Sequence, residues 1–120
     1  MFYNVIEKTI KLMETITVPK NKIAAHYHNT YDRAIENLLI SLFYGVSVID
    51  SSIAGLGGCP YAEGASGNVA TEDVVFMCQV LGLETGINLN DVMTLGGYLI
   101  NDLGYTKRSC VEFDDLENFD

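Results

Sequence analysis

The sequence predicts an α/β fold, because two short apolar runs alternate with longer segments of helical periodicity. The order along the chain is helix, strand, helix, strand, glycine-rich loop, helix and helix. A strand–helix–strand unit makes a right-handed crossover, which places its two strands parallel. Two parallel strands need further sheet along their edges, so we expect this chain to be a piece of a larger α/β protein.

The N-terminal part predicts a helix followed by a strand. Apolar side chains recur at helical spacing over residues 2–15. Pro19 ends this helix, because proline disfavours helical backbone in the residue before it. Residues 23–25, Ile-Ala-Ala, then have the composition of a short buried strand that runs into His26-Tyr27-His28.

A second helix and a second strand follow. The helix is expected over 31–44 and Gly45 stands where a glycine commonly ends a helix. Its apolar face comprises Ala34, Ile35, Leu38, Leu39, Leu42 and Phe43. Residues 46–50 are largely apolar, which is typical of a buried strand in a parallel sheet.

Two further helices are expected in the C-terminal half. One begins at Thr71, with acidic residues in its first turn as the helix dipole favours, and its apolar face comprises Val74, Met77, Cys78 and Leu81. The other is capped by Asn88 and extends to about Leu103. Its inward residues are Leu89, Val92, Met93, Gly96, Leu99 and Ile100. Residues 105–120 lose periodicity and are acidic, so we expect a disordered tail.

Composition excludes several classes of protein. The 120 residues carry a formal net charge of -9, which argues against a nucleic-acid partner because phosphate binding needs a basic face. The longest apolar run, 38–49, is too short to span a bilayer, so no membrane contact is expected. Three cysteines without a C-x-x-C spacing indicate neither a disulfide framework nor a thiolate zinc site. The N-terminus has no recognisable targeting segment.

His26 and His28 are candidate metal ligands. Residues i and i+2 of a strand point to the same face, so both imidazoles could address one ion; the alternative is one core histidine beside a solvent-facing one. Asn68 could add an amide oxygen, or could simply cap a turn. Imidazole and oxygen ligands together suit Mg²⁺ or Mn²⁺. Asp50 could line the same site, or could satisfy local backbone at the strand end.

The glycine-rich loop 55–68 carries a single thiol, Cys59, between glycines and a proline. Glycine lets another molecule approach the backbone, so this segment is a candidate active-site loop and Cys59 a candidate reactive thiol. The alternative for a free cysteine is a small buried hydrophobe, which fits Cys78. Glu72 could orient a ligand from behind, or could serve the N-terminus of its helix.

These motifs together resemble one known family. Gly55-Leu56-Gly57-Gly58-Cys59-Pro60-Tyr61-Ala62, continuing through Gly64-Ala65-Ser66-Gly67-Asn68 and Ala70-Thr71-Glu72-Asp73, resembles the signature of the 3-hydroxy-3-methylglutaryl-CoA lyase family. His26-Tyr27-His28-Asn29-Thr30-Tyr31 is similar to the His-x-His motif of that family, and Asp50-Ser51-Ser52 to its next strand. The resemblance extends from about Val18 to Leu103.

The resemblance implies a (β/α)₈ TIM barrel, of which residues 1–104 would be the C-terminal segment, incomplete as a barrel. It implies a divalent cation, Mg²⁺ or Mn²⁺, held by His26, His28 and Asn68, with Cys59 and His26 as catalytic residues. Asp50 and Glu72 would support the ligands from behind. The implied reaction is cleavage of the acyl-CoA substrate to acetyl-CoA and acetoacetate, in the mitochondrial matrix or otherwise in the cytoplasm.

The sequence departs from the family pattern at two points. The family usually has Asp where this chain has Asn29, and the first-strand motif of the family, with its arginine and metal-binding aspartate, has no counterpart in residues 1–120. We therefore expect a segment of a lyase, and the sequence leaves open whether this segment is active on its own. One alternative is a non-catalytic fragment that docks on a full-length lyase subunit or forms a homo-oligomer. Another is a related metal-dependent acyl-CoA aldolase or synthase, which Asn29 favours and Cys59 disfavours.

Overall fold

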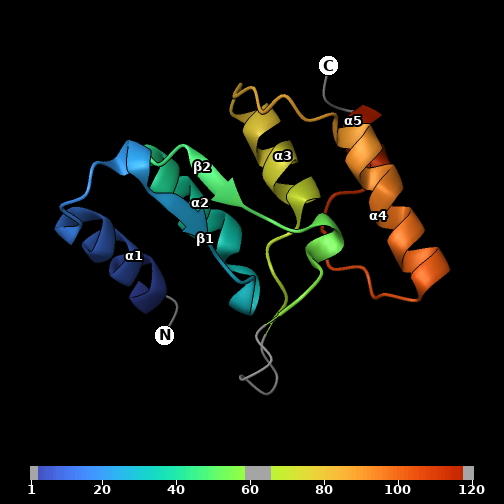
Figure 1. Cartoon of the computed structure of the whole chain (residues 1–120), viewed down its shortest axis with the longest axis horizontal. Coiled ribbons are helices and arrows are strands. Elements are labelled where there is room, and N and C mark those ends of the chain that lie inside the picture. The colour runs from blue at the N-terminus through green and yellow to red at the C-terminus, as the bar shows by residue number, and fades with distance from the viewer. Residues whose placement is uncertain (1–2, 59–65, 118–120) are drawn as a thin grey trace.

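The computed structural model describes residues 3–58 and 66–117 (Figure 1). The helices are α1 (Tyr3–Thr15), α2 (Ala34–Phe43), α3 (Thr71–Val80), α4 (Leu89–Leu103) and α5 (Phe113–Glu117). The strands are β1 (Ala24–His26) and β2 (Val48–Asp50), and short 3₁₀ turns occur at η1 (Lys20–Lys22), η2 (Thr30–Asp32) and η3 (Ile53–Gly55). The helix and strand order expected from the sequence is confirmed.

The two strands form a parallel pair, in which Ala25 lies opposite Ile49 and His26 opposite Asp50. The prediction of an α/β segment with two parallel strands is thus confirmed, and the described residues form no closed barrel. None of the helices described is both long and apolar enough to cross a bilayer.

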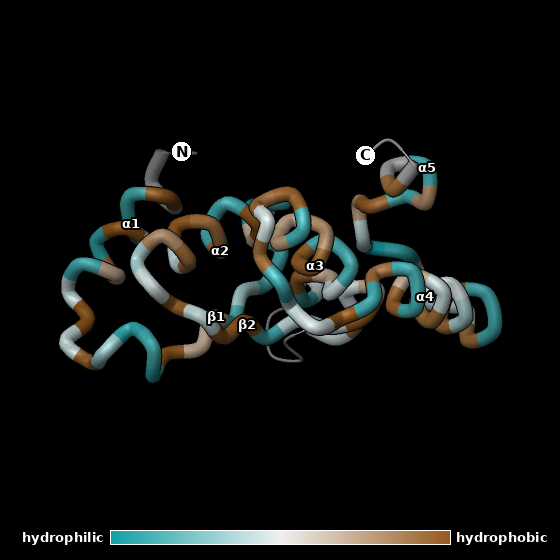
Figure 2. The backbone as a smooth tube through the Cα atoms, turned by 90° about the horizontal axis from the view of Figure 1, so that it is seen from above, coloured by the Kyte–Doolittle hydropathy of each residue, from teal (hydrophilic) through white to brown (hydrophobic). Residues whose placement is uncertain are grey.

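The apolar core lies on one face of the sheet, between the strands and three helices. Met13 of α1, Leu38 of α2 and Met77 of α3 meet Ala25 and Val46 there. Figure 2 shows α1 and α2 on the same side of β1 and β2. Because strand side chains alternate, Ala25 faces this core while its neighbours, Ala24 and His26, face the other way and are exposed.

The strands are less buried than the sequence predicts. Residues 46–50 have the composition of a buried parallel strand, but Val48 is 50% exposed and Asp50 is exposed. The helices described cover one face of the sheet only, so side chains on the other face are left accessible. That accessible face carries His26 and Asp50 at the C-terminal ends of the strands.

Several helix details differ from the sequence prediction. Helix α2 begins at Ala34, not at 31, because Tyr31 and Asp32 adopt positive φ values of 55° and 56°. Asn29 Oδ1 instead accepts a hydrogen bond from the Ala34 amide at 3.2 Å. Phe43 is 87% exposed, contrary to its predicted place on the inward face of α2. Leu39 and Leu81 are also exposed.

Helix α4 begins and ends where the sequence indicates. The Asn88 side chain accepts a hydrogen bond from the Asp91 amide, and Gly104 ends the helix with a φ of 70°. Of the residues predicted to face inward, Leu89, Met93 and Gly96 are buried.

The C-terminal segment corrects the expectation of a disordered tail. Residues 107–111 return across the molecule to the start of α3, and α5 follows them. Val111 is only 5% exposed and packs with Val75, Leu89 and Met93. Val111 and Leu116 are its apolar contacts, and the amides of Cys110 and Val111 donate to the Asp73 carboxylate. A search for apolar periodicity does not find so few apolar residues.

Candidate metal centre

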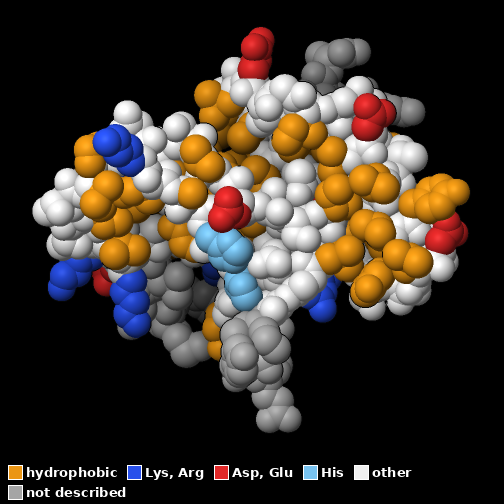
Figure 3. Space-filling model, viewed as in Figure 1, with side chains coloured by type: hydrophobic (Ala, Val, Ile, Leu, Met, Phe, Trp, Pro, Cys, Tyr) orange, Lys and Arg blue, Asp and Glu red, His pale blue; other side chains and the backbone are white. Residues whose placement is uncertain are grey.

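His26 and His28 lie together at the C-terminal end of β1. Their ring centroids are 5.8 Å apart. Asp50, opposite His26 in the register, approaches His26 Nδ1 with its Oδ2 at 3.3 Å. The side chains of His26 and Asp50 are more than half exposed. In the space-filling view the two histidines form one patch beside an acidic side chain (Figure 3).

Backbone pairing brings Asn68 to this pair of histidines. His28 and Asn68 form an antiparallel bridge, which is supported by hydrogen bonds from the Asn29 amide to Gly67 O and from the Val69 amide to Tyr27 O. On its other side the same segment is bonded to the end of β2, where the Ser52 amide donates to Val69 O. The segment 67–70 thus joins the ends of both strands.

The Asn68 amide group is oriented by one hydrogen bond. Its Nδ2 donates to Leu56 O at 2.8 Å. Because the amide nitrogen is engaged in this way, the oxygen Oδ1 is the atom that Asn68 offers to a ligand. The Leu56 carbonyl therefore fixes the orientation of the Asn68 side-chain amide.

This set of donors fits a divalent cation. Two imidazole nitrogens and one amide oxygen share one edge of the sheet, and such mixed ligands suit Mg²⁺, Mn²⁺ or a similar ion. The carboxylate of Asp50 favours a proton on His26 Nδ1, which leaves Nε2 to bind a metal. In the described part of the chain no three His, Cys, Asp or Glu residues form a metal-binding group, so the set depends on Asn68.

The glycine-rich loop leaves the site through two positive-φ glycines. Gly55 has a φ of 68° and Gly57 a φ of 88°, values that side-chain-bearing residues rarely adopt. Cys59, the predicted reactive thiol, lies outside the described residues. Of the other cysteines, Cys78 is buried as predicted, and burial raises the pKa of its thiol.

Glu72 is buried at the base of this loop. Its carboxylate accepts the Ala54 amide through Oε1 at 2.9 Å and Oε2 at 3.0 Å, and the residue is only 2% exposed. Burial raises the pKa of Glu72, while the hydrogen bond from Ala54 opposes that rise. Any effect of Glu72 on the histidines would act through η3, since its described hydrogen bonds go to Ala54.

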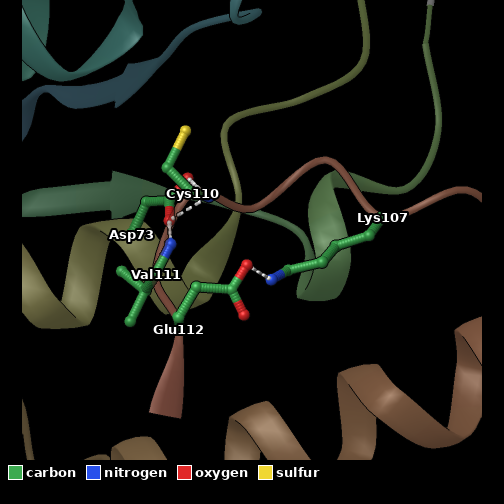
Figure 4. Close-up of polar contacts among 5 residues, drawn as sticks. All are labelled: Asp73, Lys107, Cys110, Val111 and Glu112. Atoms are coloured by element: carbon green, nitrogen blue, oxygen red, sulfur yellow. Dashed lines mark hydrogen bonds and ion pairs between the residues drawn. The ribbon is translucent and has the colours of Figure 1, made fainter. Parts of the chain in front are cut away.

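The neighbouring Asp73 holds the C-terminal segment, a role that the sequence analysis missed. Asp73 Oδ1 accepts the amides of Cys110 at 2.8 Å and Val111 at 3.0 Å (Figure 4). Lys107 and Glu112 form an ion pair in the same segment (Figure 4). Burial raises the pKa of Asp73, and the two backbone donors oppose the shift. No spacing in the acidic tail signals this contact.

Arg108 was missed for the same reason. Its Nη1 donates to Gly57 O at 3.1 Å and lies 3.5 Å from Gly55 O, at the start of the glycine-rich loop. The only sign of this contact in the sequence is the positive charge of Arg108 next to an acidic tail, and that charge does not identify the partner of Arg108.

Comparisons with known proteins place these features in a family. Residues 2–98 match the model of the HMGL-like family. The mitochondrial hydroxymethylglutaryl-CoA lyase of Gallus gallus is 52% identical over 94 residues, which are 78% of this chain and 32% of that protein. The cytoplasmic 3-hydroxy-3-methylglutaryl-CoA lyase of Homo sapiens is 46% identical over 103 residues, 84% of this chain and 28% of that protein.

Solved structures give the same result. Hydroxymethylglutaryl-CoA lyase from Pseudomonas aeruginosa superposes with a TM-score of 0.83 at 39% identity, covering 93% of this chain and 38% of that one. An HMG-CoA lyase from Acinetobacter baumannii, in complex with coenzyme A and 3-methylmalate, superposes with a TM-score of 0.74 at 35% identity, covering 88% and 34%. The chain thus spans about a third of the relatives it matches. With its family model, its relatives and its fold in agreement, the chain belongs to the HMGL-like family.

Proposed function

We propose that this chain supplies the cation-binding end of a hydroxymethylglutaryl-CoA lyase site. The observation that supports the proposal is that the His26 and His28 rings lie 5.8 Å apart and that His28 pairs with Asn68 through the backbone. The similarity to lyases at about half identity supports the same reaction for the assembled site. The proposed ion is Mg²⁺ or Mn²⁺.

The reaction breaks one carbon–carbon bond of the substrate. The bond between C2 and C3 of 3-hydroxy-3-methylglutaryl-CoA is cleaved as the C3 hydroxyl loses its proton, and acetoacetate leaves. The electron pair of the bond passes to the acetyl-CoA carbanion, which then takes a proton. A bound divalent cation would polarise the hydroxyl and carbonyl oxygens of the substrate.

Each residue of the site has a proposed part in this chemistry. His26, whose Nδ1 faces Asp50, would take part in removal of the hydroxyl proton by holding the cation through Nε2, because a bound cation lowers the pKa of a ligated hydroxyl. The released proton would pass to water. The thiol of Cys59 would donate the proton to the carbanion. His28 and Asn68 would orient the ligated oxygens, and Glu72 would hold the base of the loop through Ala54.

The proposed substrate class is acyl-CoA, in line with the coenzyme A bound to the lyase from Acinetobacter baumannii. The relatives that the chain matches include mitochondrial and cytoplasmic enzymes. We propose the mitochondrial matrix as the compartment, with the cytoplasm as the second choice.

The metal site can be tested apart from catalysis by titrating the chain with Mn²⁺ and following free Mn²⁺ by electron paramagnetic resonance. His26→Ala, His28→Ala and Asn68→Ala should each weaken binding by at least about tenfold, because each removes one of three donors. Asn90→Ala on the exposed surface of α4 is the matched control and should bind as the parent does. Equal binding by all variants would contradict the proposed ligand set.

Activity is tested by incubating the chain with substrate and Mg²⁺ or Mn²⁺ and assaying acetoacetate. Turnover that is lost in Cys59→Ser and kept in Cys110→Ser would show a catalytic site within these 120 residues. No turnover, together with intact Mn²⁺ binding, would show that the remaining part of the lyase fold is needed. Turnover that persists in Cys59→Ser would contradict the role of the thiol.

A second candidate function is docking on a full-length lyase subunit. It is favoured by the open side of β2, where Val46, Val48 and Ile49 line a cavity of about 630 Å³ together with Leu83 and Ile87. Size-exclusion chromatography of the chain, alone and mixed with a full-length relative, tests this. Co-elution supports docking, and an unchanged monomer peak in both runs contradicts it.

A further inference from the structure

The side chain of Arg108 connects the C-terminal segment to the glycine-rich loop. Arg108 follows α4, more than fifty residues after the loop begins, yet its Nη1 donates to Gly57 O at 3.1 Å and lies 3.5 Å from Gly55 O. A guanidinium presents several donors in a fixed plane, so one side chain can bridge two carbonyls. Nothing in the sequence indicates that these two parts of the chain are in contact.

Glycines leave the space through which this side chain passes. A Cβ added to Gly67 would lie 1.9 Å from Arg108 Nη1 and 2.5 Å from Gly55 O. A Cβ added to Gly55 would lie 3.1 Å from Arg108 Cβ and 3.0 Å from Asn68 O. The two described ends of the loop, 55–58 and 66–68, therefore approach each other at the position of Arg108.

Three successive carbonyls of the loop are taken by two side chains. The outer two, Gly55 O and Gly57 O, face Arg108, and the middle one, Leu56 O, accepts from Asn68 Nδ2 at 2.8 Å. Peptide groups beside positive-φ glycines turn easily, because these residues have wide conformational freedom. Holding the outer carbonyls restricts the rotation of the peptide group between them.

We infer that Arg108 is a positioning residue for Asn68. It fixes the Leu56 carbonyl, which in turn holds the Asn68 amide nitrogen and leaves Oδ1 to a ligand. The contact is independent of any bound ion, and only its consequence for a cation rests on the proposed function. Arg108 lies beyond residues 2–98, the part of the chain that matches the family model.

The first experiment needs no metal. The Nδ2 protons of Asn68 are followed by solvent exchange in nuclear magnetic resonance spectra of the chain. Arg108→Ala should speed their exchange by about tenfold, because the acceptor Leu56 O is no longer held. Lys107→Ala is the matched control: it removes the neighbouring cation, whose ion pair is with Glu112, and should leave this exchange unchanged. Unchanged exchange in Arg108→Ala would overturn the inference.

The second experiment uses Mn²⁺ affinity in a double-mutant cycle. Arg108→Ala should weaken binding by about tenfold, and the double variant with Asn68→Ala should bind no more weakly than Asn68→Ala alone. Additive losses would mean that Arg108 acts other than through Asn68, which contradicts the inference. If Arg108→Ala does not fold, Arg108→Lys replaces it in the cycle, because lysine keeps the aliphatic stem and the positive charge. Its loss of Mn²⁺ affinity should be smaller and should likewise disappear when Asn68 is already alanine.

The two arms separate the two hypotheses. A parent chain that binds no Mn²⁺, combined with faster Asn68 exchange in Arg108→Ala, would defeat the proposed metal site and support the positioning role. A parent chain that binds Mn²⁺, combined with unchanged exchange in Arg108→Ala, would support the metal site and defeat the positioning role.

Discussion

Two regions of this molecule are held together by different forces. Behind the sheet, apolar side chains such as Leu38 and Met77 pack against Ala25. At the start of α3 lies a region that we call the polar junction, where Glu72, Asp73 and Arg108 bind backbone groups of distant segments. Apolar packing in the core stabilises the fold but does not fix the orientation of individual groups. The hydrogen bonds of the polar junction do fix orientations, next to the sheet edge that carries the candidate ligands.

The difference follows from where backbone groups lack partners. Along the edge that they share, β1 and β2 bond to each other, so their inner face needs only apolar packing. The turns around Ala54 and Cys110 have no such ladder, and carboxylates accept their amides instead. Substitutions in the core should therefore lower global stability, and substitutions in the polar junction should also change local geometry.

The largest effect is expected from Leu38→Ala in the apolar core. Leu38 is completely buried, so its truncation removes apolar burial and leaves a cavity. We expect a loss of about 2–5 kcal/mol in the free energy of unfolding, measured by urea denaturation. A loss below about 1 kcal/mol would mean that α2 does not depend on this packing.

A smaller loss is expected from Gly96→Ala, which disturbs the polar junction from α4. Its Cβ would lie 2.4 Å from Glu72 Oε1, so the carboxylate must move from the Ala54 amide. We expect a loss of about 1–3 kcal/mol in the free energy of unfolding. Gly97→Ala is the matched control, because nothing lies within 4 Å of its Cβ. It should raise stability by about 0.5–1 kcal/mol through helix propensity.

The same division explains how much could be predicted from the sequence. Apolar periodicity marks the segments that form the core, so the order of helices and strands was predictable. The cap at Asn88 and the stop at Gly104 were predictable from residue type. The pairing of His26 with Asp50 follows from parallel register at the strand ends, where the sequence places both residues as candidates. The helix ends depend on local pattern alone, and the pairing of His26 with Asp50 needs only the parallel arrangement of two neighbouring strands.

The polar junction could not be predicted, because its contacts depend on tertiary position. A carboxylate in the first turn of a helix is typical whether or not a distant amide binds it, so Asp73 carried no specific signal. Arg108 stood beside an acidic tail that predicted disorder. Phe43 was misplaced for a related reason: it is the last residue of α2, and periodicity alone does not show whether a neighbouring segment covers the end of a helix.

The free energy of unfolding should depend on pH through the polar junction, because Glu72 and Asp73 lie there. Burial raises the pKa of Glu72 above 4.5 and that of Asp73 above 3.8, so over the range that begins at those values the folded protein binds more protons than the unfolded chain. Their contribution to the free energy of unfolding therefore falls as pH rises through the raised pKa values. In Asp73→Asn this fall should be less steep, measured by urea denaturation at a series of pH values. Parallel curves for parent and variant would contradict it.

The smallest effect is expected from Phe43→Ser at the end of α2. The side chain is 87% exposed and its described ring contact is with Tyr44, so little apolar area is returned to water by the change. We expect a change of about 0.5 kcal/mol or less in the free energy of unfolding. Leu38→Ala, on the buried face of the same helix, is the internal reference for the same measurement. A loss comparable to that of Leu38→Ala would mean that Phe43 is covered in solution, and the apolar core would then extend beyond the helices that now bound it.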